Sequence, residues 1–251
     1  MGGWLHDRVS AAWWRVRVGG LACWTERRVG RPAPPAGRPV TTIEVSTDVV
    51  CAARRTHRVL ADLPVAASDR AAVTGMPSWR AEEYLAARTL VRTLLAEIGR
   101  PHDGPIANRG CGRPWIPGLP GVGISLSHSA GWVAAAVSPG RAVGVDVQTP
   151  VEVSAEVIAR CCSAADAAGL AALPDSVRAL EFAWIWSTQE ACVKATGAGL
   201  GGLPWTVPVA PGQPGGSWNE VEWVALREHS AVPFSCAFTE LGHERGNADD
   251  E

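Results

Sequence analysis

The 251-residue sequence predicts an α+β protein built as a pseudo-two-fold pair of similar subdomains, each made of helix followed by an antiparallel sheet. In the first half, a helical pattern over 78–98 precedes strand-like runs between 122 and 147. In the second half, helical patterns between 154 and 196 precede strand-like runs between 205 and 238. Because this order repeats in units of about 100 residues, we expect two related subdomains, although their sequences show no strong identity.

The two ends of the chain differ in composition from the body. Residues 1–40 contain four tryptophans, seven arginines and a proline-rich stretch at 31–39, which is typical of a poorly ordered extension ending in a stiff linker. An over-long start-site assignment and a basic membrane-surface helix are the alternatives. The acidic tail, 242–251, is expected to fray. The body then divides into an N-terminal subdomain, 41–145, and a C-terminal subdomain, 146–241.

The N-terminal subdomain is expected to begin with a strand, because apolar residues recur at 43, 45, 49 and 50. Ser78 is the expected N-cap of the first long helix, and Gly99 is expected to end it. The stretch 100–121 is rich in Gly and Pro and indicates a loop. Short segments of turn composition separate three further strand-like runs, which predict a β-meander over Val122–Ser127, Trp132–Val137 and Ala142–Val147.

The C-terminal subdomain shows helical patterns at Ser154–Cys161, Ala164–Leu173 and Ser176–Thr196. The glycine-rich stretch 197–202 should end the last helix as a mobile loop. It spells G-x-G-x-x-G, but we reject a dinucleotide site because that motif follows a strand, and this one follows a helix. Strand-like runs are expected after it, at Trp205–Val209, Val221–Leu226 and Phe234–Phe238.

Charge and cysteine content exclude several classes of protein. The net charge of −2 offers no basic field for nucleic acid. The apolar stretch 9–24 is interrupted by Arg15 and Arg17, so it fits neither a signal peptide nor a membrane span, and we expect a cytoplasmic protein. The seven cysteines form no C-x-x-C pair, which argues against a zinc cluster or a disulfide framework and for buried thiols in a reducing compartment.

One lysine, Lys194, stands among 22 arginines. One explanation is that this single lysine is present by chance. The other is that position 194 needs a compact ammonium group where the wide guanidinium fork will not serve. Helical spacing places Trp186, Glu190 and Lys194 on one face. An exposed ion pair is the plain interpretation, but the helix around it is mostly apolar, and a buried pair is costly unless a metal or phosphate compensates.

Asp146 lies near the end of the apolar strand-like run 142–147. A lone carboxylate there either caps the following turn or binds a ligand. Together with Glu190 it could hold one hard divalent ion, and Mg²⁺ suits such a site because it accepts one or two carboxylates and completes its shell with water and phosphate oxygens.

A third candidate group is Ser125-Leu-Ser-His-Ser129, where a strand meets a turn. A Ser-His hydrolase is disfavoured, because the stretch 123–127 lacks the final glycine of a nucleophile elbow and no strand-to-helix turn follows it. Hydroxyls and an imidazole at a strand end are better suited to bind an anion.

These segments together resemble the 4′-phosphopantetheinyl transferases, in particular the larger, pseudo-dimeric subgroup that serves polyketide, nonribosomal-peptide and siderophore carrier proteins. The specific motifs are Gly144-Val-Asp-Val-Gln148 and, further along, Trp186-Ser-Thr-Gln-Glu190-Ala-Cys-Val-Lys194. Supporting motifs are Gly112-Arg-Pro114, Ser125–Ser129 and the helical segment Ala81–Arg88. The resemblance covers about residues 78–240 and implies the phosphopantetheinyl transferase fold.

The resemblance implies transfer of the 4′-phosphopantetheine arm of coenzyme A to a serine of an acyl- or peptidyl-carrier protein, with release of adenosine 3′,5′-bisphosphate. It implies that Asp146 and Glu190, with Gln148, hold Mg²⁺ on the diphosphate, and that Glu190 also acts as base. It further implies that Lys194 and His128 contact phosphate, that Ser127 lies close to the nucleotide, and that Arg113 and Arg80 hold the 3′-phosphate end. A fused pseudo-dimer is expected to be a monomer.

Two positions depart from the family pattern. Gln148 stands where an acidic residue is frequent, and Gln189 replaces the usual lysine before Glu190, which we expect to remove a positive charge near the substrates. These departures motivate an alternative, a catalytically degenerate module that binds carrier protein or coenzyme A without turnover. A Mg²⁺-dependent nucleotide phosphohydrolase that uses the same acids is a further alternative.

Overall fold

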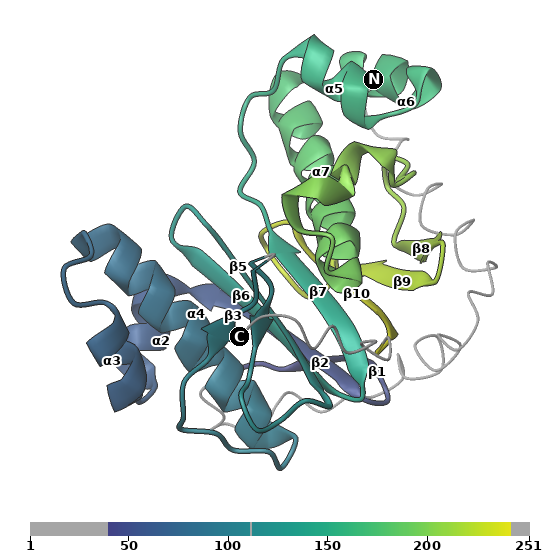
Figure 1. The fold of residues 1–251 in the computed structure, drawn as a ribbon. Coiled ribbons are helices and arrows are strands. Elements are labelled where there is room, and N and C mark those ends of the chain that lie inside the picture. Colours follow the sequence, from purple (N-terminus) through teal and green to yellow (C-terminus); the bar gives the residue numbers. More distant parts are fainter. Residues whose placement is uncertain (1–39, 111, 242–251) are drawn as a thin grey trace, which may run out of the picture. The chain divides into compact units, whose positions relative to one another are not determined.

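The computed structural model describes residues 40–110 and 112–241, which form two four-stranded antiparallel sheets with helices packed on them (Figure 1). The side chain of Leu200 lies outside this description as well. The predicted extension, 1–40, and the acidic tail, 242–251, lie outside the described residues, except for Val40, which is buried.

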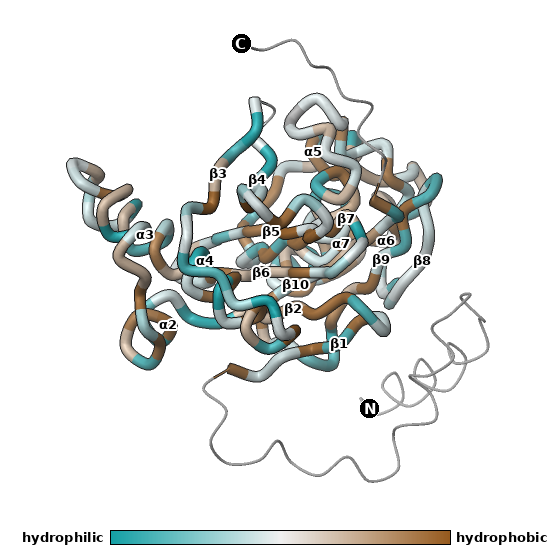
Figure 2. The backbone as a smooth tube through the Cα atoms, turned by 60° about the horizontal axis from the view of Figure 1, so that its bottom comes forward, coloured by the Kyte–Doolittle hydropathy of each residue, from teal (hydrophilic) through white to brown (hydrophobic). Residues whose placement is uncertain are grey.

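The first sheet has the strand order β1-β2-β6-β5. Its strands are β1 (Ile43–Ser46), β2 (Val49–Arg55), β5 (Val122–Ser129) and β6 (Trp132–Pro139). Helix α4 (Ser78–Glu97) packs on it, with the short helices α2 (Thr56–Asp62) and α3 (Ala67–Ala72) beside α4. Hydrophobic residues follow one another along β2 and β6 (Figure 2), and both strands are central, so their apolar side chains form the core with the buried face of α4.

The second sheet has the order β7-β10-β9-β8 and contains β7 (Arg141–Val147), β8 (Gly215–Trp218), β9 (Val221–Ala225) and β10 (Phe234–Glu240). Helix α7 (Asp175–Thr196) packs on it. Ahead of α7 come α5 (Ala155–Cys161) and α6 (Ala164–Ala171), and after it come the short 3₁₀ turns η2 (Gly199–Gly202) and η3 (Pro204–Thr206). Gly197 ends α7 in the left-handed conformation, with a φ of 75°.

The α+β class with antiparallel sheets is confirmed, and the predicted long helices match α4 and α7. Each half carries one long helix on one four-stranded sheet. A pseudo-two-fold relation between the halves stays a prediction, and so does the division of the body at 145/146, which runs through β7.

The predicted β-meander is wrong at its third strand. β6 already pairs with β2 on one side and β5 on the other, so neither of its edges is open to β7. β7 pairs instead with β10, from Phe234 opposite Val147 to Glu240 opposite Arg141. The strand that carries Asp146 therefore belongs to the second sheet.

Smaller errors concern turns and short strands. The predicted strand at 205–209 is replaced by the turn η3 and an irregular segment, and β8 was missed because its glycines are poor strand formers. The predicted loop 100–121 contains two short paired strands, β3 (Ala107–Asn108) and β4 (Pro114–Trp115). Ser78 is the first residue of α4, and Pro77 occupies the N-cap position.

The two sheets meet where β5, an edge strand of the first, runs beside β7, an edge strand of the second. Side-chain hydroxyls replace the usual backbone ladder at this seam. Val145 N donates to Ser125 Oγ (3.0 Å), Val147 N to Ser127 Oγ (3.3 Å) and Thr149 N to Ser129 Oγ (3.0 Å). We call these three contacts the serine ladder. They satisfy backbone donors that would otherwise be buried without partners.

On its other side, β7 lies against the backbone of α7 at Gly144. A Cβ atom on Gly144 would meet Ala191 O at 1.9 Å and Ala195 N at 2.5 Å, distances that no side chain can occupy. Only a glycine allows this approach, which brings the last turns of α7 beside the end of β7.

We therefore expect Gly144→Ala to lower the free energy of unfolding by about 3 kcal/mol, because backbone must move to admit the methyl group. Urea denaturation measures this change. Gly169→Ala is the matched control, since a Cβ at Gly169 in α6 meets nothing within 4 Å. There the same substitution should raise stability by about 0.5–1 kcal/mol through helix propensity. Equal stability of Gly144→Ala and wild type would contradict the close approach.

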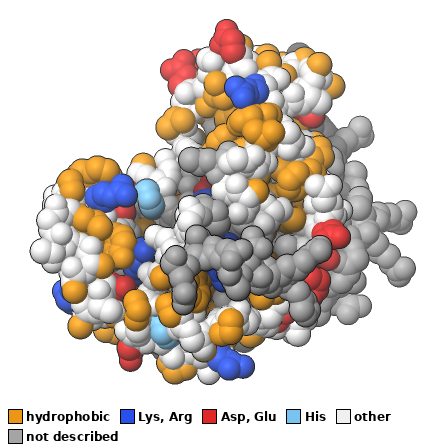
Figure 3. All heavy atoms as spheres, in the orientation of Figure 1, with side chains coloured by type: hydrophobic (Ala, Val, Ile, Leu, Met, Phe, Trp, Pro, Cys, Tyr) orange, Lys and Arg blue, Asp and Glu red, His pale blue; other side chains and the backbone are white. Residues whose placement is uncertain are grey.

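Among the described residues, no helix combines the length and the apolar character needed to cross a membrane. The described cysteines are all free thiols, and Cys51, Cys161, Cys192 and Cys236 are buried. On the face shown in Figure 3, basic and acidic side chains are interspersed and do not gather into one charged patch.

Candidate functional site

Asp146 and Lys194 form an ion pair where the end of β7 meets the last turns of α7. Lys194 Nζ lies 2.6 Å from Asp146 Oδ1 and 3.2 Å from Val145 O. Asp146 is buried, and Ser127 Oγ donates to the same carboxylate oxygen at 2.7 Å. The compact ammonium thus fits between a backbone carbonyl and a buried carboxylate, which is the kind of position expected for the single lysine.

Glu190 lies on α7 one turn before Lys194 and is half-buried. Burial raises the pKa of its carboxyl group; the positive charge of Lys194 acts against this rise, and the negative charge of Asp146 adds to it. The two carboxylates therefore interact with each other and with one ammonium group. When both are ionised, the ammonium balances only one of them, so the cluster attracts a further cation.

The donor set suits a magnesium ion. Asp146 and Glu190 offer two carboxylates, and Gln148, which is half-buried just after β7, offers an amide oxygen while its Nε2 donates to Thr149 O at 3.0 Å. Among the described residues, no group of three or more His, Cys, Asp or Glu side chains could hold a metal. Two carboxylates leave most of the shell to water and phosphate oxygens, as Mg²⁺ prefers and structural zinc does not.

His128 follows Ser127 at the end of β5 but points to the other face of the strand, because neighbouring residues of a strand alternate. Its ring is exposed, and Nδ1 lies 3.2 Å from Glu83 Oε2 on α4. Arg80 lies exposed in the first turn of α4, three residues before Glu83. His128 and Glu83 therefore form a polar pair between β5 and α4.

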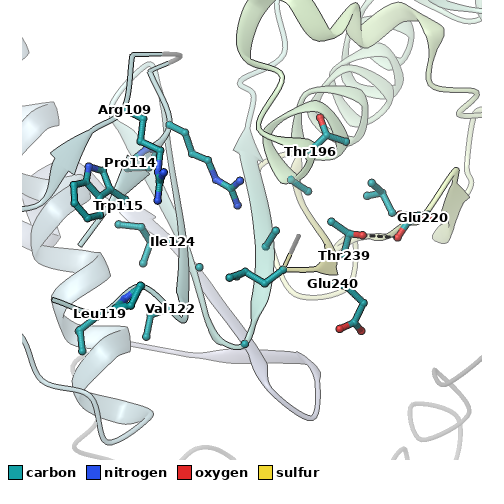
Figure 4. A pocket seen from close by; sticks show the side chains of 18 of the residues that line it. Arg109, Pro114, Trp115, Leu119, Val122, Ile124, Thr196, Glu220, Thr239 and Glu240 are labelled. Carbon is teal, nitrogen blue, oxygen red and sulfur yellow. Dashed lines mark hydrogen bonds between the residues drawn. The ribbon is translucent and has the colours of Figure 1, made fainter. Parts of the chain in front are cut away.

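Arg113 lies by the end of α7. A Cβ atom on Gly197 would meet Arg113 Nη1 at 2.9 Å, so the guanidinium group packs over this glycine. Both lie near a cavity of about 1120 Å³ that Arg113 helps to line. Figure 4 shows Arg109 and Trp115 on one side of the cavity, with Thr196 and Glu220 on the other.

The cavity and the ion pair occupy opposite ends of the seam. Residues 122–124 of β5 and Ala142 of β7 line the cavity, whereas Ser127 and Asp146 lie toward the other ends of the same strands. The structure therefore brings Ser127, Asp146, Glu190 and Lys194 together. His128 is the next residue after Ser127 in β5, but its side chain lies on the other face of the strand, and Arg113 lies near the end of α7. The structure does not bring Arg80 into contact with this cluster.

Gln189 does not lie where the sequence analysis expected it. Its side chain is completely buried, and Nε2 donates to Cys161 O (2.8 Å) and Val207 O (2.9 Å). It therefore holds the end of α5 and the segment after η3 against α7. We expected Gln189 to remove a positive charge from the surroundings of the substrates. That expectation is wrong about the position of the residue, because position 189 faces the protein interior.

Sequence reasoning missed Glu83 as the partner of His128, because Glu83 was included only within the motif Ala81–Arg88. Arg88, at the end of the same motif, is a buried guanidinium stacked 3.5 Å over the ring of Tyr84, and no contact joins it to the Asp146 cluster among the described residues. Burial lowers the pKa of Arg88. The sequence places Glu83 on a helix, but helical spacing does not show which strand a residue of that helix meets.

Two family models match consecutive parts of the chain. The model described as the 4′-phosphopantetheinyl transferase N-terminal domain matches residues 68–138, and the model of the 4′-phosphopantetheinyl transferase superfamily matches residues 142–230. The boundary between the two matches falls at the turn between β6 and β7. The first match includes α4 with β5 and β6 of the first sheet, and the second includes α7 with β7, β8 and β9 of the second sheet.

Curated relatives match over shorter segments. The 4′-phosphopantetheinyl transferase Sfp of Bacillus subtilis (strain 168) is 32% identical over 89 residues, which are 36% of this chain and 39% of that protein. The 4′-phosphopantetheinyl transferase psf-1 of Bacillus pumilus is 30% identical over 122 residues, 48% of this chain and 52% of that protein. The matched region thus spans about half the length of these relatives or less.

Proposed function

Because the chain belongs to the 4′-phosphopantetheinyl transferase superfamily, we propose that it transfers the 4′-phosphopantetheine arm of coenzyme A to a serine of an acyl- or peptidyl-carrier protein. Adenosine 3′,5′-bisphosphate is the other product. The observation that carries the proposal is the cluster of Asp146, Glu190 and Lys194, two carboxylates and the only lysine of the chain, which meet at the seam between the two matched regions.

The reaction forms a bond between the serine oxygen of the carrier and the β-phosphorus of coenzyme A, and it breaks the bond to the bridging oxygen of the diphosphate. The serine proton goes to Glu190, whose raised pKa makes the carboxylate a better base than an exposed one. Negative charge grows on the departing phosphate, and the Lys194 ammonium stabilises it. Asp146 holds that ammonium in place.

A magnesium ion held by Asp146 and Glu190, with Gln148, would supply positive charge to the diphosphate oxygens. His128 would contact phosphate, and Ser127 would lie close to the nucleotide. Arg113 and Arg80 would bind the 3′-phosphate end of coenzyme A as bidentate donors, which guanidinium groups are suited to be. We further propose that the protein is a cytoplasmic monomer that requires neither nucleic acid nor membrane. The carrier proteins that it modifies would belong to polyketide, nonribosomal-peptide or siderophore pathways.

The test is the intact mass of several apo carrier proteins after incubation with this protein, coenzyme A and Mg²⁺. We expect the mass of the phosphopantetheine arm to be added to at least one carrier, and the addition to stop in excess EDTA. Carrier proteins whose serine is replaced by alanine are the control. Binding of coenzyme A without transfer would favour a degenerate binding module, and release of phosphopantetheine to water without a carrier would favour a phosphohydrolase.

A further inference from the structure

The three serines of the serine ladder each accept from a backbone N–H of β7 or of the segment just after it, but only one of them also contacts the charged cluster. The Ser125 hydroxyl accepts from Val145 N, and the Ser129 hydroxyl accepts from Thr149 N and shares a hydrogen bond with Thr149 Oγ1 at 2.9 Å. The Ser127 hydroxyl accepts from Val147 N and lies 2.7 Å from Asp146 Oδ1.

A serine hydroxyl has one proton to donate and two lone pairs that accept. An ionised carboxylate can only accept, so the single proton of Ser127 goes to Asp146. Its lone pair meanwhile accepts from Val147 N, which fixes the position of Oγ relative to the strand that carries Asp146. Ser127 is buried, so water does not compete readily for either contact.

Asp146 Oδ1 thus receives two donors from two different elements, the hydroxyl of Ser127 on β5 and the ammonium of Lys194 on α7. Two donors on one oxygen fix the rotation of the carboxylate about its terminal bond. They leave Oδ2 as the oxygen that these two contacts do not engage. Without Ser127, Lys194 alone would hold the carboxylate, and a single contact permits the group to turn about it.

We propose that Ser127 is a positioning residue that orients the Asp146 carboxylate and thereby connects the seam between the two sheets to the charged cluster. The inference rests on the function proposed above, but it concerns a contact to Asp146 and does not require Ser127 to touch coenzyme A. Ser125 and Ser129 serve the seam alone.

The test compares Ser127→Ala with Ser125→Ala. Both variants remove one hydroxyl from the same strand and leave one buried N–H of β7 without its acceptor, so both should lower the melting temperature by similar amounts. Only Ser127→Ala frees the Asp146 carboxylate. We expect it to lower kcat for transfer to an apo carrier by about 10–100-fold with little change in the KM for the carrier, whereas Ser125→Ala stays close to wild type.

Mn²⁺ binding gives a second readout that does not depend on transfer. The amount bound to each protein is measured by electron paramagnetic resonance in the absence of substrates, with Mn²⁺ as the probe for a Mg²⁺ site. Ser127→Ala should bind Mn²⁺ about 10-fold more weakly than wild type or more, and Ser125→Ala should not. Ser127→Thr keeps the hydroxyl, so its kcat and its Mn²⁺ affinity should be close to those of the wild type. If Ser127→Ala does not fold, the threonine variant tests the inference in its place.

Equal kcat and equal Mn²⁺ affinity in the two alanine variants would overturn the inference, as would Ser127→Thr that folds but behaves like Ser127→Ala. Failure of the wild-type protein to modify any carrier would instead count against the proposed function. In that case the Mn²⁺ comparison still tests whether Ser127 orients Asp146.

Discussion

Lys194→Arg is expected to lower the rate of phosphopantetheine transfer by about 100-fold or more, although it preserves the positive charge. The ammonium reaches Asp146 Oδ1 and Val145 O from a part-buried position beside the close contact of β7 and α7 at Gly144. A guanidinium group is wider and planar, and its donors diverge, so it cannot make both contacts in the same space. It would push the carboxylate or the phosphate away.

The measurement is the initial rate of carrier modification at saturating coenzyme A, for a variant whose melting curve shows that it is folded. Arg178→Lys is the matched control, because it exchanges the same two side chains on the same helix. Arg178 pairs with an exposed Asp175 at the start of α7, so its replacement should leave transfer unchanged. A near-normal rate in Lys194→Arg would mean that the site needs charge at this position and not a compact ammonium.

Glu190→Gln is the second variant with a large expected effect, and stability and activity should change in opposite directions. Burial is the main cause that raises the pKa of Glu190 in the folded protein above the value of an unfolded chain. The folded state therefore binds the Glu190 proton more tightly than the unfolded chain does. This preference stabilises the folded wild type at pH values below the unfolded pKa, and the stabilisation is lost as the pH rises through the folded pKa. A neutral amide of the same shape avoids that loss.

In the presence of a metal chelator and at neutral pH, the Glu190→Gln variant should consequently unfold at a higher temperature than the wild type. The difference should shrink as the pH falls below the ordinary range of a carboxyl group, where Glu190 is protonated in both states. A variant that is less stable than the wild type at neutral pH would show that the Glu190 carboxylate stabilises the fold and is not kept there for chemistry.

Local signals were sufficient to predict much of the fold. Helices α4 and α7 could be predicted because long apolar stripes at helical spacing outweigh the residues around them. The strand that pairs with β7 could not be predicted, because the alternating residues of β7 are compatible with any neighbouring strand. Its partner, β10, comes far later in the chain, and what excludes β6 is that both edges of β6 are already paired.

The site shows the same division between local and distant information. The i,i+4 spacing predicted that Glu190 and Lys194 share a face, and the structure adds that Lys194 pairs with Asp146. That Gln189, their neighbour, faces the interior could not be predicted, since a motif records a residue type and not its burial. The serines at 125, 127 and 129 were visible as an alternating pattern, but their acceptor role depends on β7 lying beside β5.

The proposed transfer depends on the carboxylate of Glu190 acting on the hydroxyl of the carrier serine. The most direct test is the rate of transfer by Glu190→Gln at saturating coenzyme A and carrier, with Mg²⁺ present and folding verified. If Glu190 is the general base and also helps to hold the metal, its replacement should lower the rate by about 100- to 10,000-fold. A rate within a few-fold of the wild type would contradict the account and place the chemistry elsewhere on the protein.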